Sequence, residues 1–100
     1  VVVDNDGYLA GILTRTDLLR AHTDGIDCRN VTVSEYMTCD VVTVGLNTTM
    51  GEVAKILSER HIHRVVAVRN EEDRVRPIAV VSTADVLYHF VKANSRSNSA

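Results

Sequence analysis

Residues 11–19, GILTRTDLL, and residues 79–87, AVVSTADVL, repeat one pattern of side chains. In each stretch, a pair of aliphatic residues is followed by a hydroxyl residue and, three positions later, by an aspartate. A hydroxyl residue at the N-cap of a helix and an acidic residue at N3 each accept the other's backbone amide. The sequence therefore predicts two strand-to-helix junctions of the same kind. The residues concerned are Thr14 and Asp17 in the first copy and Ser82 and Asp85 in the second.

Short strands and amphipathic helices are expected over most of the chain. Thr49 and Glu52 form a third capping pair, and apolar residues follow them at helical spacing. A single helical turn is expected within residues 31–38. Because units that recur in one chain commonly stack, the two copies are expected to form a stacked pair. Further strands are expected over residues 1–3, 8–13, 41–44, 64–68 and 77–81, and further helices over residues 16–22 and 82–92.

The composition excludes several classes of protein. The 100 residues are 45% hydrophobic and 24% charged, which is the balance of an ordinary soluble globular domain. The net charge is −2 and the basic residues are scattered, so no basic stripe is available to neutralise nucleic-acid phosphates. No apolar run approaches the roughly 20 residues of a membrane span, so no membrane contact is expected within these residues.

The two cysteines, Cys28 and Cys39, have neither the number of a disulfide framework nor the spacing of a metal site. We interpret them as reduced thiols, as in a cytoplasmic protein. The chain has no nucleophile elbow, phosphate-binding loop or zinc-binding HExxH motif, and it has no pair of carboxylates placed for acid-base chemistry. We therefore do not expect it to be an enzyme or to need an obligatory cofactor or metal.

The order of these features resembles the cystathionine-β-synthase (CBS) domain, a β-α-β-β-α unit that occurs in tandem pairs. The resemblance is carried by residues 36–57, YMTCDVVTVGLNTTMGEVAKIL, by residues 61–68, HIHRVVAV, and by the two junctions. It implies an α/β (α+β) fold with packed sheets and outer helices. The expected organisation is the C-terminal half of a first repeat (1–22), a linker (23–30), a complete second repeat (31–93) and a disordered tail (94–100).

The resemblance also implies a ligand site at the first junction. From the residues alone, Thr14 and Asp17 are explained by helix capping, although free amides at a helix start also suit phosphate or polar sugar groups. In CBS domains that bind adenosine compounds, the junction aspartate holds the ribose, which here implies Asp17 with Ile12, Thr14 and Thr16. In a tandem pair this aspartate faces the other repeat's base-binding strand, which implies an adenine pocket. The adenine-pocket residues implied by the family are Val41, Val42 and Ile62.

The basic pair His63 and Arg64 is implied to bind phosphate. By default such a pair is solvated charge at a strand edge, but arginine's fixed donor fork suits phosphate well. The nucleotide-sensing γ subunit of AMP-activated protein kinase carries a similar pair at this place. His61 has no such match and is expected to be exposed. A second half-site, which depends on a facing first-repeat segment, is implied at Val80, Ser82 and Asp85.

Two functions are compatible with this sequence. The first is a regulatory sensor that binds AMP, ADP or ATP between its repeats, S-adenosylmethionine being disfavoured because it offers no phosphate to the basic pair. The second is a ligand-free module for dimerisation or protein interaction, in which the junctions act only as caps. In either case the chain could be the regulatory part of a channel, transporter or enzyme. The expected partner is another CBS repeat or a second copy of the chain.

Overall fold

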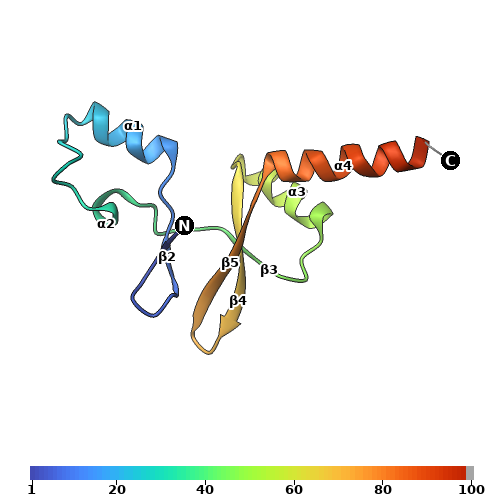
Figure 1. Cartoon of the computed structure of the whole chain (residues 1–100), viewed down its shortest axis with the longest axis horizontal. Helices are drawn as coiled ribbons and strands as arrows, with labels where there is room; N and C mark the ends of the chain where they lie inside the picture. The colour runs from blue at the N-terminus through green and yellow to red at the C-terminus, as the bar shows by residue number, and fades with distance from the viewer. Residues whose placement is uncertain (99–100) are drawn as a thin grey trace. The chain divides into compact units, whose positions relative to one another are not determined.

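The computed structural model describes residues 1–98, with side chains described for residues 1–92, and it has the predicted mixed α/β fold (Figure 1). Two compact units make up the chain: the first unit contains residues 1–41 and 70–77, and the second contains residues 42–69 and those from 78 on. The elements in order are β1 (Val2–Val3), β2 (Leu9–Gly11), α1 (Arg15–Thr23), α2 (Val33–Tyr36), β3 (Thr43–Gly45), α3 (Met50–Arg60), β4 (Arg64–Glu71), β5 (Arg74–Ser82) and α4 (Thr83–Asn98).

The first unit begins with a hairpin in which β1 pairs antiparallel with β2. Asp4 forms the turn, because its carboxylate accepts the amides of Asp6 at 2.9 Å and Tyr8 at 3.0 Å. Gly7 has a φ of 84°, a backbone conformation that residues with a Cβ rarely adopt, so this position favours glycine. After β2, Ile12 exchanges two backbone hydrogen bonds with Thr38, at 2.9 and 2.8 Å.

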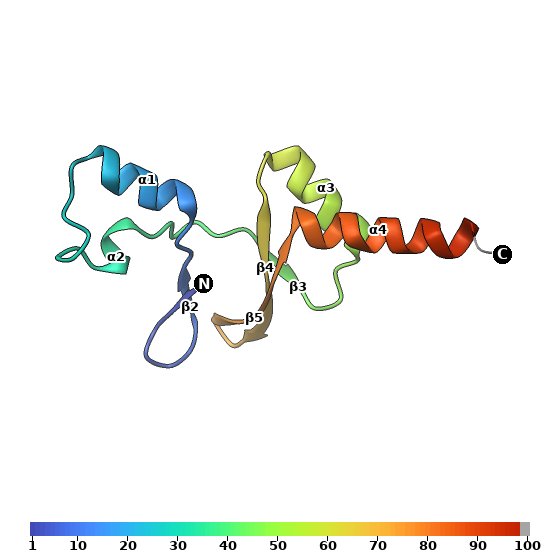
Figure 2. The ribbon, with the colours of Figure 1, turned by 45° about the horizontal axis from the view of Figure 1, so that its top comes forward.

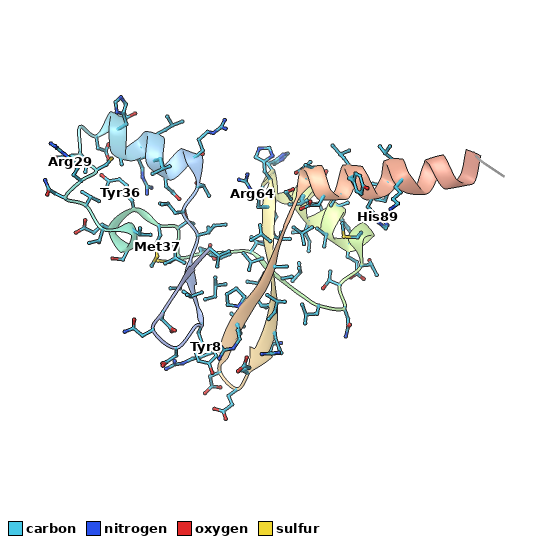
Figure 3. The ribbon with its side chains drawn as sticks, viewed as in Figure 1. Tyr8, Arg29, Tyr36, Met37, Arg64 and His89 are labelled. Carbon is cyan, nitrogen blue, oxygen red and sulfur yellow. The ribbon has the colours of Figure 1, made fainter. Side chains whose placement is uncertain are left out.

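The tip of the β4–β5 hairpin packs on this turn within the first unit. The Tyr8 ring, near the tip in Figure 3, lies 5.1 Å from the guanidinium carbon of Arg74 and 4.6 Å from that of Arg76. Such cation–π contacts are attractive because the face of an aromatic ring carries partial negative charge. Arg74 Nη1 lies 3.4 Å from Asp6 Oδ2, and Arg76 Nε donates to Glu71 Oε2 at 2.6 Å. We call these five side chains the hairpin clamp.

The second unit is a parallel β-α-β crossover followed by a hairpin strand and α4. Strand β3 pairs parallel with β4, β5 lies on the other side of β4, and α3 and α4 pack against each other (Figure 2). Residues 65–68 of β4 are all buried, which is typical of a parallel strand covered on both faces. Apolar residues at helical spacing on α3 pack against buried residues of β4. The resulting core cluster consists of Val44, Val53, Leu57, Val65, Ala67 and Val86.

Several predicted boundaries differ from the structure. The strand expected over 41–44 starts at Thr43, so Val41 and Val42 precede β3. Pro77, expected at a strand start, lies inside β5, where it is tolerated because β5 is the edge strand of its sheet. The tail expected to be disordered from residue 94 belongs to α4 as far as Asn98. A started helix extends by one hydrogen bond per residue, and no proline stops this one. Residues 99–100 lie outside the described residues.

Candidate functional site

Asp17 forms the predicted capping box at the start of α1 and is almost completely buried, with 4% of its surface exposed. Its Oδ2 accepts the Thr14 amide at 2.9 Å and the Thr14 hydroxyl at 3.1 Å, while the Asp17 amide donates to Thr14 Oγ1 at 3.3 Å. The Thr14 amide lowers the pKa of the Asp17 carboxyl, and burial opposes this shift without reversing it. Asp17 is therefore a buried carboxylate that stays ionised.

Thr38 also contacts this carboxylate, which sequence reasoning did not anticipate. Its hydroxyl donates to Asp17 Oδ1 at 3.2 Å and lies 3.4 Å from Oδ2. Arg20 Nη2 lies 3.6 Å from Oδ1 on the exposed side. Both oxygens of Asp17 are therefore occupied by groups of the chain itself. Thr38 is 21 residues away in sequence, and only its hydroxyl within the YMTC segment could have suggested the contact.

Asp85 forms the same set of cap contacts in a different environment. Its Oδ2 accepts the Ser82 amide at 2.8 Å and the Ser82 hydroxyl at 3.0 Å, and its amide donates to Ser82 Oγ at 3.3 Å. The Ser82 amide lowers the pKa of this carboxyl. Asp85 is exposed, and its Oδ1 accepts no hydrogen bond from any described residue. The prediction of two equivalent caps is confirmed, while the accessibility of the two carboxylates differs.

The basic pair lies where the chain enters β4, and both side chains are exposed (Arg64 is labelled in Figure 3). The carbonyl of His63 accepts the Thr83 amide at 2.9 Å and lies 3.4 Å from the Thr83 hydroxyl. Thr83, a second residue that sequence reasoning missed, thus fixes the backbone of the pair beside the start of α4 and the Ser82–Asp85 cap. Arg64 forms no ion pair with any described carboxylate.

The predicted adenine-pocket residues are half-buried side chains with structural contacts of their own. Val42 and Ile62 pack against the core cluster of the second unit, and the Val42 carbonyl accepts the Val66 amide at 3.1 Å. Val41 is half-buried in the first unit. The other predicted contacts of the first unit are Ile12, half-buried, and Thr16, exposed; those of the second are Val80, exposed, and Ser82, half-buried.

Each unit brings together part of the predicted constellation. The first unit joins Thr14 and Asp17 and adds Thr38, whereas the second places His63 next to the start of α4. The predicted pocket combines residues of both units, and its assembly stays a prediction. No group of three metal-binding side chains occurs among the described residues. None of the helices in that part of the chain is long and apolar enough to cross a membrane.

His61 ends α3 in the left-handed conformation, with φ 54° and ψ 42°, and its side chain is exposed as predicted. A residue with a Cβ is strained there, so we expect His61→Gly to raise the free energy of unfolding by about 0.5–1 kcal/mol. Thermal unfolding followed by circular dichroism measures this change. As a matched control, His22→Gly in α1 should lower the stability, because glycine weakens a helix. A loss of stability in His61→Gly would contradict the strained cap.

Comparison with known proteins identifies the family. Residues 1–24 and 33–92 match the CBS domain. Arabinose 5-phosphate isomerase KdsD of Pseudomonas aeruginosa is 38% identical over 87 residues, which are 87% of this chain and 26% of the isomerase. The chain thus spans about a quarter of the length of that curated relative.

Solved structures with this fold include proteins crystallised with adenosine compounds. The CBS domain pair of protein MJ0100, in complex with 5′-methylthioadenosine and S-adenosyl-L-methionine, has a TM-score of 0.75 and 28% identity, covering 92% of this chain and 68% of that one. The cytosolic domain of the Mg²⁺ channel MgtE, in complex with ATP, has a TM-score of 0.68 and 30% identity, covering 87% of this chain and 32% of that one. This chain therefore belongs to the CBS domain family.

Proposed function

We propose that this chain is a regulatory module that binds an adenosine nucleotide through its junction aspartates. The observation that carries the proposal is a pair of aspartates, Asp17 and Asp85, each held ionised at a helix start by the same hydrogen bonds. An ionised carboxylate only accepts hydrogen bonds, and the adjacent hydroxyls of a ribose offer it two donors. Adenosine, which contains this ribose, is also the part shared by the ligands of the MJ0100 and MgtE structures.

The basic pair supports a ligand that carries phosphate. His63 and Arg64 are exposed beside the start of α4, and the guanidinium group of Arg64 suits phosphate geometry. We therefore favour AMP, ADP or ATP over S-adenosylmethionine. The resemblance of the basic pair to that of the γ subunit of AMP-activated protein kinase supports the same choice. The adenine would lie against Val41, Val42 and Ile62. A ligand that contacts two repeats favours their docked arrangement, so its effect is a population shift.

Removing both carboxylate charges tests the proposal. In the double variant Asp17→Asn/Asp85→Asn, calorimetric titration should show AMP and ATP binding at least about 10-fold more weakly, because a hydrogen bond to a charged group contributes about 1.5–3 kcal/mol. Asp73→Asn removes the same charge from the β4–β5 turn and should bind like the unchanged chain. Unaltered affinity in the double variant would contradict the role of the aspartates.

An interaction module is the second candidate, favoured by the apolar surface of α4. Leu87, Tyr88 and Val91 are 59%, 68% and 67% exposed, which is unusual for large apolar side chains on one helix. A second copy of the chain or another CBS repeat could cover them, giving the expected homodimer. Light scattering after size exclusion decides between the candidates: a stable dimer that binds no nucleotide would favour the interaction module.

The effector is a separate part of the proposal. Because this chain spans about a quarter of the KdsD isomerase, we propose that it regulates an enzyme, channel or transporter to which it is attached. Catalysis itself is not proposed for these residues.

A further inference from the structure

Asp17 and Asp85 differ in whether a carboxylate oxygen is open to a ligand. At Asp85, the cap contacts all use Oδ2, and Oδ1 accepts nothing from the described residues. At Asp17 the Thr14 contacts also use Oδ2, but Oδ1 already accepts the Thr38 hydroxyl at 3.2 Å. A carboxylate oxygen can accept two hydrogen bonds, but Asp17 is only 4% exposed, so a sugar hydroxyl that approaches Oδ1 meets the Thr38 hydroxyl there.

We infer that the Thr38 hydroxyl is a built-in competitor for the ligand at Asp17, so that binding there requires Thr38 to give up its hydrogen bond. This inference rests on the proposed function and adds a regulatory feature to the same site. A threonine hydroxyl and a ribose hydroxyl are the same kind of donor to a carboxylate. Thr38 thus occupies in the free protein the place that a ribose hydroxyl takes in the complex.

The competitor can move without unfolding the segment that carries it. The Thr38 backbone is held by its two hydrogen bonds to Ile12, whereas the hydroxyl reaches Asp17 only through the side chain. Rotation about χ1 moves the hydroxyl to another staggered position and leaves the backbone bonds in place. Arg20, whose side chain is 55% exposed, can leave Oδ1 more easily still. Breaking the Thr38 hydrogen bond is thus the main free-energy cost that a ligand has to overcome to bind Asp17.

Two consequences follow for a pair of sites on one chain. At Asp85, whose half-site depends on a facing first-repeat segment, no hydroxyl has to leave the carboxylate before a ligand binds. Binding at Asp17 additionally breaks the side-chain tie between the start of α1 and residue 38, which leads into β3. The Thr38 hydroxyl thereby raises the ligand concentration needed to fill the Asp17 site. It also couples binding there to the release of residue 38, a change that the Asp85 site lacks.

The test uses the Asp85→Asn background, in which Asp17 is the remaining junction carboxylate. Adding Thr38→Val removes the hydroxyl at nearly constant volume and leaves Oδ1 short of a donor until a ligand supplies one. We expect AMP to bind about 3- to 10-fold more tightly, as the loss of one opposing hydrogen bond predicts. Thr38→Ser restores the hydroxyl and should return the affinity to that of the background.

A ligand without ribose hydroxyls separates competition from general loosening of the site. For 2′,3′-dideoxyadenosine monophosphate, Thr38→Val should give no gain, because this ligand has no sugar hydroxyl to donate to Asp17. Thr38→Ala serves as a second hydroxyl deletion if the valine variant does not fold, as judged by its thermal unfolding.

Three results would overturn the inference, and they are distinguishable. Unchanged or weaker AMP binding after hydroxyl removal means that Thr38 does not compete. An equal gain for the dideoxy ligand means that the site has merely loosened. Absence of AMP binding in the unchanged chain and in every variant contradicts the proposed function itself, and the inference with it.

Discussion

Leu57→Ala is expected to lower the free energy of unfolding by about 2–5 kcal/mol, which is the usual range for a leucine in a packed core. Leu57 is 6% exposed on the inner face of α3, and the other members of the core cluster are valines and an alanine from α3, β3, β4 and α4. Valine is β-branched and has few alternative rotamers, and alanine has none, so these side chains can fill the space only partly. The loss of stability should therefore exceed the transfer free energy of the removed apolar atoms alone.

Urea unfolding followed by circular dichroism measures this loss, and an exposed leucine provides the control. Leu46 belongs to the same unit and is 56% exposed, so Leu46→Ala should change stability by no more than about 0.5 kcal/mol. Equal effects of the two substitutions would contradict the assignment of the core to the α3 side of β4.

Gly11→Ala is expected to be the most damaging small substitution in the first unit. A Cβ at residue 11 would lie 2.7 Å from the Thr38 carbonyl oxygen and 2.9 Å from Met37 Sδ. The methionine side chain can move, but the Thr38 oxygen is backbone and accepts the Ile12 amide at 2.9 Å. The chain can relieve this clash only by separating the segments, so we expect a loss of about 1–3 kcal/mol.

Gly45→Ala is the matched control for this substitution. A Cβ at residue 45 would lie 3.7 Å from Thr48 Oγ1, which is ordinary van der Waals contact, so little change is expected. Both variants can be compared by thermal unfolding. If Gly11→Ala is as stable as Gly45→Ala, the expected clash between residue 11 and the Thr38 carbonyl oxygen is contradicted.

Local patterns in the sequence predicted most of the fold because they depend on neighbouring residues. The hydroxyl–aspartate pairs at residues 14–17 and 82–85 and the Thr49–Glu52 pair all form the helix starts that their spacing indicates. The apolar stripe of α3 likewise packs into the core as its period predicts. The end of α4 was not predictable in this way, because a polar composition does not by itself stop a helix that is already formed.

The difference between the two junction aspartates could not be read from the junctions. Their cap contacts are the same, so local sequence makes Asp17 and Asp85 look alike. What buries Asp17 is a separate segment, brought to it by the backbone pairing of Ile12 with Thr38. The accessibility of a carboxylate within a repeated motif thus depends on long-range packing, which motif spacing does not encode.

The hairpin clamp has a consequence for how this chain can be divided. Because residues 70–77 pack on the turn after β1, the first unit is assembled from two stretches with the β3-α3-β4 crossover inserted between them. Proteolysis or gene truncation between residues 41 and 42 would therefore not release two self-sufficient pieces. The N-terminal piece would lose Arg74 and Arg76, and Tyr8 would lose both of its cationic neighbours. We therefore expect an N-terminal piece that ends at residue 41 to be less stable than the same residues within the whole chain.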